Sequence, residues 1–473
     1  MIVEPTGQDE GQRRHSIPRD VAQVRGHLPI WVWLFIIGLV IPLFVYAGPL
    51  RLSVYRLVLL TAFFPTVFFW LSGRAGRIRL PDICVVIICV WTSLSMVIKD
   101  GGLGASIEAI GILWVETLGA YLLARCYIRT PEAFFAVTRL LFWIALLLLP
   151  FALYELYTGP SPILQAFGKI GLSYGENPNP GRLGLERVQG PFTHPIHFGV
   201  FFGGLIGLFY YVLGYGQPWI NRMGCGGLAL FLCFASLSSG PLVAAMSQII
   251  FVLWDGIMKS VRTRWYIFVG LAIAAFIVVD LISNRTPFHI IISYLAFSEH
   301  TAYNRILIWI FGSASIWANP VFGIGLTGNW LRPYWMSDSA DMFWIVPAMR
   351  HGIVVWIAYL ALFFTVFLSV IYREVLSTRV QWYRMGYICS VSGFFFVGWT
   401  VHFWETIFVF FMFLLASGMW LLDWEEGEEG NNTPAEEGRE TGVPYTRFAR
   451  KSDKMWRDRS PVREAQRKNR VTR

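Results

Sequence analysis

Apolar residues along this chain form long runs separated by polar connections. The runs fall at roughly 28–48, 55–73, 83–98, 105–124, 133–156, 196–215, 225–238, 241–257, 265–283, 343–371, 386–402 and 406–422. A helix must cross ~30 Å of hydrocarbon, and only helices and closed barrels satisfy the backbone within lipid. The pattern predicts an all-α, polytopic membrane protein with about twelve transmembrane helices. Within 225–257, the segment Ser238-Ser239-Gly240-Pro241 either turns between two helices or kinks a single one.

The composition supports a membrane protein and argues against a soluble one. Of the 473 residues, 55% are hydrophobic and only 15% are charged, whereas soluble domains are about a quarter charged. The net charge of +9 does not indicate nucleic-acid binding, because most basic residues lie in short loops or in the C-terminal tail. The cysteines lie mostly in or beside apolar runs, so neither a disulfide framework nor a metal motif is predicted.

The basic residues also predict the orientation of the chain. Alternate connections are rich in arginine and lysine, namely Arg74, Arg77, Arg79, Arg125, Arg129, Lys259, Arg262, Arg264, Arg373, Arg379 and Arg384. By the positive-inside rule these connections are cytoplasmic. We therefore expect a cytoplasmic N-terminal segment at 1–27, a transmembrane domain at 28–422 and a disordered cytoplasmic tail at 423–473. The basic half of that tail is expected to attract anionic lipid.

Two connections are much longer than the others, and both are predicted on the external side. They cover 157–195 and 284–342, and long loops in a compact protein are usually functional. Within the second, apolar residues recur at helical spacing over 302–318. This spacing predicts an amphipathic helix that lies at the membrane surface.

The end of the first external loop carries candidate functional residues. Arg187 offers a planar fork suited to phosphate oxygens, and His194 or His197 could move a proton. The structural alternatives are that Arg187 reaches to lipid headgroups and that His194 caps the next helix. For His197, one turn into the span, the structural role is favoured.

The second external loop supplies the other candidates. Arg305 begins the surface helix, and Asp341 and Arg350 flank the start of the next apolar run, where an ionisable residue suggests function. The alternative is that Asp341 and Arg350 form a structural ion pair. The segment Asn319-Pro320-Val321-Phe322-Gly323-Ile324-Gly325 is only superficially like a phosphate loop, because no strand precedes it and no Lys-Ser/Thr follows it.

Four further ionisable residues have weaker claims to function. Glu108 and Glu116, two helical turns apart, could form a proton relay, although a hydrogen bond accepted from Arg139 or from a tyrosine is favoured. A structural role is also favoured for His402 and Glu405, in the last short external loop.

The order of these stretches resembles the O-antigen ligase/polymerase superfamily of bacterial membrane glycosyltransferases. The resemblance covers roughly 185–360 and rests on Arg187-x-x-Gly190-x-Phe192-x-His194-Pro195, Arg305-x-x-x-Trp309, Asn319-Pro320-x-Phe322-Gly323-x-Gly325 and Asp341-Met342-x-Trp344 ending at Gly352. Family ligases carry a histidine followed by Asn or Ser where this chain has Asp341-Met342. An aspartate there is similar to the exopolysaccharide polymerase branch and favours chain polymerisation over ligation.

The resemblance implies transfer of a glycan from an undecaprenyl-pyrophosphate carrier to an acceptor hydroxyl, at the outer face of the bacterial inner membrane. Arg187 and Arg305, with Arg350 as a third candidate, are expected to bind the pyrophosphate, and Asp341 or His194 is expected to act as the base. No metal and no cofactor are expected; the expected partners are the lipid-linked oligosaccharide, the bilayer and other polysaccharide assembly proteins. The alternatives are a glycan ligase, a flippase for lipid-linked glycan and a non-catalytic scaffold.

Overall fold

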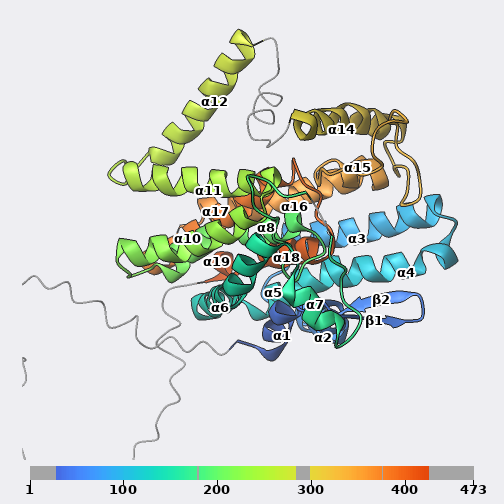
Figure 1. Cartoon of the computed structure of the whole chain (residues 1–473), viewed down its shortest axis with the longest axis horizontal. Helices are drawn as coiled ribbons and strands as arrows, with labels where there is room; N and C mark the ends of the chain where they lie inside the picture. The colour runs from blue at the N-terminus through green and yellow to red at the C-terminus, as the bar shows by residue number, and fades with distance from the viewer. Residues whose placement is uncertain (1–27, 178–179, 284–298, 375–376, 425–473) are drawn as a thin grey trace, which may run out of the picture. The chain divides into compact units, whose positions relative to one another are not determined.

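The computed structural model describes residues 28–177, 180–283, 299–374 and 377–424, which belong to one compact unit (Figure 1). The expected N-terminal segment 1–27 and the tail from 425 onward lie outside the described residues. Asp423 and Trp424, which we expected in the tail, are part of the folded unit: the Asp423 carboxylate accepts hydrogen bonds from Arg79 and Arg125.

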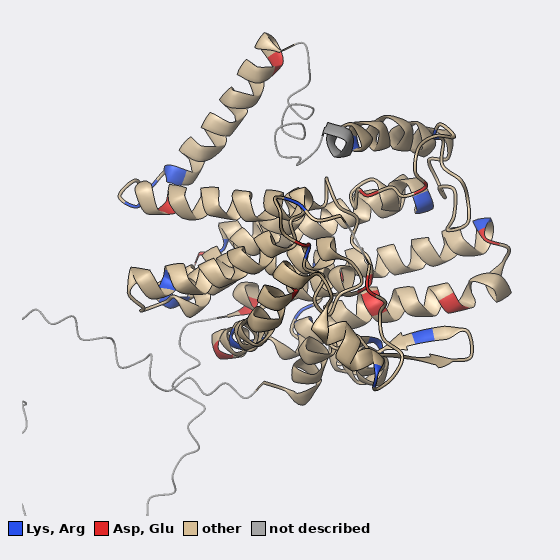
Figure 2. Cartoon of the chain, viewed as in Figure 1, with Lys and Arg blue, Asp and Glu red and all other residues tan. Residues whose placement is uncertain are grey.

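Nine helices within the described residues are long and apolar enough to cross a membrane. They are α2 (Val54–Leu71), α3 (Leu80–Lys99), α4 to α5 (Leu103–Tyr127), α6 (Pro131–Thr158), α8 to the π-helical turn η3 (Pro195–Leu213), α11 (Ser239–Ile257), α12 (Arg264–Ile282), α16 (Ile353–Tyr372) and α18 to α19 (Glu405–Asp423). Figure 2 shows long stretches of these helices without charged residues. The structure is thus a helical protein of membrane-spanning character.

The described residues do not confirm the count of twelve spans, and the first apolar run does not form a spanning helix. The apolar run 28–48 forms only the nine-residue helix α1 (Ile30–Gly38), followed by a hairpin of β1 (Phe44–Ala47) and β2 (Leu50–Ser53). Nine residues rise only about 14 Å as a helix, which is half of a hydrocarbon core. The hairpin forms because β-branched and aromatic residues flank a turn in which Gly48 has a φ of 62°.

The other differences concern where helices begin and end. The segment 225–257 forms two helices, α10 (Trp219–Ala235) and α11, joined by a tight turn at 236–238. The run 343–371 also divides, into α15 (Val346–His351) and α16 (Ile353–Tyr372), because Gly352 breaks it at a φ of 92°. The helix α17 (Thr378–Val397) is long, but its polar residues keep it out of the nine.

Two helices form the centre of the unit. Nearly every residue of α18 (Glu405–Ser417) is buried, as is nearly every residue of α8 (Pro195–Gly203). A helix that is apolar on all faces packs in a core, and here α18 packs on α5 (Ala120–Tyr127) while α8 packs on α10 and α11. By contrast, α12 has no buried residue, so all of its apolar surface is left for lipid.

The remaining elements are short or lie in the two long loops. The first loop contains α7 (Pro162–Gly168), and the second contains α14 (Glu299–Ala318), which agrees with the helix expected over 302–318. Two π-helical turns interrupt spans, η2 (Val115–Gly119) after α4 (Leu103–Trp114) and η3 (Phe209–Leu213) after α9 (Ile206–Leu208); the short α19 (Trp420–Asp423) follows α18.

Candidate functional site

The turn between α10 and α11 gathers arginines from the first long loop. The guanidinium of Arg187 donates from Nε to the carbonyl of Ser236 (3.3 Å) and from Nη2 to Oγ of Ser238 (2.8 Å). Arg182 donates from Nη1 to the carbonyl of Leu237 (2.8 Å). Both arginines are thereby fixed on three consecutive residues of the turn.

A third arginine, from the second long loop, lies beside the start of α11. Arg305, on α14, is only 7% exposed and donates from Nε to the carbonyl of Thr400 (3.2 Å). Its Nη2 would lie 3.5 Å from a Cβ at Gly240, the second residue of α11. The two long loops therefore approach each other around the start of α11, and we call Arg182, Arg187 and Arg305 the arginine cluster.

The positive charges of the arginine cluster lie in a buried environment, which destabilises the charged state of a guanidinium. Burial lowers the pKa of Arg187 to about 10, and the positive charge of Arg182 contributes to the shift. Burial also lowers the pKa of Arg305 to about 10, against the opposing effect of Asp341. Among the described residues, no carboxylate forms an ion pair with Arg187 or Arg305. Such an arrangement is costly without an anion and suits one.

A buried carboxylate holds the backbone beside Arg187. Oε1 of Glu155, near the end of α6, accepts the backbone N–H groups of Gln189 (2.6 Å) and Gly190 (3.2 Å). Gly190 has a φ of 57°, and a Cβ there would lie 2.8 Å from the ring of Phe198. The Arg187-x-x-Gly190 motif thus needs glycine for a left-handed turn against α8. The contacts of Gln189 and Gly190 with Glu155 thus fix the backbone that follows Arg187.

The histidines lie at the start of α8. His194 is its N-cap, where Nδ1 accepts the N–H of Ile196 (3.1 Å), so the capping alternative is confirmed. Burial lowers the pKa of His194 to about 4, with Arg187 adding to the effect. The imidazole is therefore neutral at pH 7, and the cap occupies the lone pair of Nδ1, its one acceptor nitrogen. His197 is buried, and its Nδ1 lies 2.9 Å from Oγ1 of Thr193.

Asp341 lies near Arg305, as its effect on the arginine's pKa shows. The carboxylate accepts a hydrogen bond from Oγ of Ser339. The next residues pair with the connection between α17 and α18: the N–H of Phe343 donates to the carbonyl of Val401 (3.1 Å). Because Arg305 binds the neighbouring carbonyl of Thr400, this connection holds both candidates in place.

Arg350 does not join the arginine cluster. Its Nη1 donates to the carbonyls of Gly325 (3.1 Å), Leu326 (2.8 Å) and Gly328 (2.8 Å), and no ion pair joins it to Asp341. Arg350 therefore holds the loop after α14 by its backbone carbonyls. It lies apart from the expected pyrophosphate contact, and the alternative ion pair with Asp341 is not formed. The positive charge of Arg350 does affect the connection between α17 and α18, because it adds to burial in lowering the pKa of His402 to about 3.

The glycine-rich segment of the second loop joins two helices rather than forming a phosphate loop. The N–H of Ile324 donates to the carbonyl of Met349 (3.0 Å), and the N–H of Gly325 donates to that of Arg350 (2.9 Å). A Cβ at Gly323 would lie 2.4 Å from the backbone of Arg350. The glycines therefore allow close backbone packing against α15.

The weaker candidates form ion pairs of their own. Glu116, in a π-helical turn, accepts from Tyr55 (3.1 Å) and from Nε of Arg56 (2.7 Å), so its partner is a tyrosine, as favoured, and Arg56 rather than Arg139. Glu405 forms an ion pair with Arg51. Its φ of 47° is unusual for a residue other than glycine.

Sequence reasoning missed Arg182 and the polar groups that receive the arginines. Arg182 precedes Arg187 by five residues in the same long loop, and this proximity could have identified it as a candidate. Nothing in the sequence identified Ser238 or the carbonyl of Thr400, because these become partners only through packing. Among the described residues, no group of three or more His, Cys, Asp or Glu is placed to hold a metal ion.

The arrangement has the charge that suits an anion between the two long loops, beside a neutral histidine and a carboxylate. No protein-family model matches the sequence, and no curated protein matches it either.

Proposed function

We propose that this protein is a membrane-embedded glycosyltransferase that polymerises a bacterial surface polysaccharide. It would transfer a glycan from undecaprenyl pyrophosphate to an acceptor sugar hydroxyl. The proposal is carried by one observation: Arg187 is bound to the turn before α11 and Arg305, from the other long loop, lies against Gly240 at the start of α11, and neither has an ion-pair partner among the described residues.

The reaction needs what this arrangement offers. When the anomeric carbon–oxygen bond breaks, negative charge develops on the departing pyrophosphate, and fixed cations in a poorly hydrated site stabilise it. Arg187 and Arg305 supply those cations, and a guanidinium contacts two phosphate oxygens at once. The acceptor hydroxyl loses its proton to a base. Asp341, beside Arg305, is the better candidate, because His194, beside Arg187, could accept the proton only by giving up its cap to Ile196.

The proposed setting is the bacterial inner membrane, with both termini in the cytoplasm and the two long loops outside. The side chain of Tyr334, in the second loop, is 95% exposed and is suitable for labelling. A Tyr334→Cys variant should react with a membrane-impermeant maleimide added to intact cells with permeabilised outer membranes. Reaction only after the inner membrane is opened would contradict the orientation and the mechanism with it.

The decisive experiment is elongation by the purified protein in lipid vesicles. Wild type should lengthen undecaprenyl-pyrophosphate oligosaccharide, and Arg187→Gln and Arg305→Gln should each slow elongation by roughly 100- to 1000-fold. Arg74→Gln is a control, because Arg74 is exposed and remote in sequence from both loops. Full elongation by both variants at normal protein levels would refute the assignment. Movement of the donor across the vesicle membrane without elongation would indicate a flippase.

A further inference from the structure

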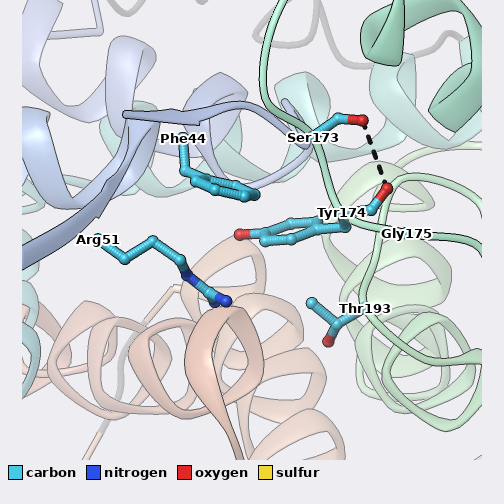
Figure 3. A pocket seen from close by; sticks show the side chains of 6 residues that line it. All are labelled: Phe44, Arg51, Ser173, Tyr174, Gly175 and Thr193. Carbon is cyan, nitrogen blue, oxygen red and sulfur yellow. Dashed lines mark hydrogen bonds between the residues drawn. The ribbon is translucent and has the colours of Figure 1, made fainter. Parts of the chain in front are cut away.

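A cavity of about 200 Å³ lies next to the candidate site and has no part in the mechanism above. It opens between the β1–β2 hairpin and the first long loop (Figure 3), and its lining consists of Phe44, Arg51, Ser173, Tyr174, Gly175 and Thr193. Thr193 immediately precedes His194. The cavity is therefore adjacent to the proposed reaction centre.

Backbone pairing fixes an aromatic wall in this cavity. The N–H of Phe44 donates to the carbonyl of Leu172 (3.0 Å), and the N–H of Tyr174 donates to that of Pro42 (3.2 Å), so the loop extends the hairpin. The two rings stack with centroids 5.9 Å apart. The guanidinium of Arg51 lies over both, 5.1 Å from the ring of Phe44 and 5.6 Å from that of Tyr174. The wall is apolar on its ring faces and carries donors at its edge.

Polar groups beside the cavity lack partners. Arg51 binds one carboxylate oxygen of Glu405, while Oε2 of the same carboxylate is buried with no hydrogen-bond partner in the described part of the chain. Thr193 contacts Nδ1 of His197, whose Nε2 is likewise buried and unpartnered there. Buried polar atoms are normally paired, and Glu405 also has a strained backbone. Both residues lie behind the lining of the cavity, where each contacts one of its polar side chains, Arg51 or Thr193.

We propose that this cavity is the acceptor subsite and binds a single sugar ring, an inference that rests on the proposed function. A sugar ring has an apolar C–H face, which suits the wall of Phe44 and Tyr174, and a rim of hydroxyls, which suits Arg51, Ser173 and Thr193. Because Glu405 neutralises Arg51, the cavity fits an uncharged ring better than a phosphate.

The position of the cavity completes the geometry of the transfer. The segment that ends at Thr193 begins with Arg187, so one stretch of chain lines the acceptor cavity at one end and contributes to the arginine cluster at the other. The cavity volume is about seven times the ~30 Å³ that a water molecule occupies in the liquid. This leaves room for one ring, with the rest of the acceptor chain in solvent.

The test measures binding without turnover. Full-length protein in lipid nanodiscs, with no donor present, is titrated with the methyl glycosides of glucose, galactose, mannose and N-acetylglucosamine, and binding is followed by saturation-transfer NMR. At least one glycoside should bind. Tyr174→Leu should weaken that binding by roughly 3- to 10-fold, because the stacking face is lost, whereas Tyr174→Phe should leave it nearly unchanged. The matched control is Tyr157→Leu, at an exposed tyrosine of α6, which should bind as wild type does.

Three outcomes would overturn the subsite: no glycoside binds wild type, Tyr174→Leu binds as tightly as wild type, or inorganic pyrophosphate displaces the glycoside. Failure of the subsite differs visibly from failure of the proposed function. If the protein elongates chains but binds no glycoside, only the subsite is wrong. If it binds glycosides through Tyr174 but never elongates, the polymerase reaction is wrong and the sugar site stands.

Discussion

Replacing Arg305 by glutamine should leave the protein as stable as before while removing its activity. Burial lowers the pKa of this arginine from 12.5 to about 10, which corresponds to roughly 3 kcal/mol against the charged state. The substitution removes that cost. It also removes the hydrogen bond to the carbonyl of Thr400, and a bond from a charged donor contributes about 1.5–3 kcal/mol. The net change in the free energy of unfolding should therefore lie between about zero and a gain of 2 kcal/mol.

Arg125 provides the matched control for this prediction. It is also a buried arginine, at 1% exposure, but it forms ion pairs with Asp82 and Asp423. Breaking a buried pair leaves an uncompensated charge and costs about 3–5 kcal/mol. Arg125→Gln should therefore lower the melting temperature clearly, unlike Arg305→Gln.

The assay compares melting temperature in detergent with elongation in vesicles for the two variants. Arg305→Gln should melt at or above the wild-type temperature and lose roughly 100- to 1000-fold in rate. Arg305→Lys should recover little, because an ammonium cannot make the paired contact of a guanidinium. If Arg305→Gln melts several degrees lower, or elongates normally, the arginine has a structural role and the reasoning is refuted.

Three further predictions follow from particular contacts. The pKa of His194 is about 4 in the folded protein and 6.5 in an unfolded chain, so the unfolded state binds more protons between these pH values. The melting temperature should therefore fall as the pH drops from 6.5 to 4, and it should fall less steeply in His194→Asn. Melting curves measured over a pH series would check this. Gly352→Ala should destabilise by about 3 kcal/mol or more, because φ is 92° and a Cβ would lie 2.0 Å from the carbonyl oxygen of Val321; normal folded yield would contradict this. Arg350→Gln should expose the 325–328 loop to protease and reduce activity only in proportion to folded protein, since Arg350 binds loop carbonyls; a lower rate per folded molecule would return it to the anion site.

The sequence determined the spanning helices because lipid allows few alternatives. Where an apolar run was long and free of polar residues, as in α3, α6 and α16, a helix of spanning length followed. The apolar runs did not predict the structure where backbone pairing or a turn determined it. The run 28–48 is apolar throughout most of its length, yet its second half pairs as a hairpin that the first long loop extends. Hydropathy does not report such pairing, because the same residues suit a buried helix and a strand.

For the candidate site, the sequence supplied the chemical types and the tertiary structure decided which of them meet. Arginines in the two long loops were predicted as anion ligands, and Arg187 and Arg305 both lie around the start of α11. Arg350 was equally plausible on sequence, but packing directs it to loop carbonyls instead. The sequence did not predict the cavity beside Tyr174, because the cavity depends on a backbone pairing between residues about 130 positions apart. Contacts between such distant segments form only when the whole bundle packs, and they decide what a charged or aromatic side chain can bind.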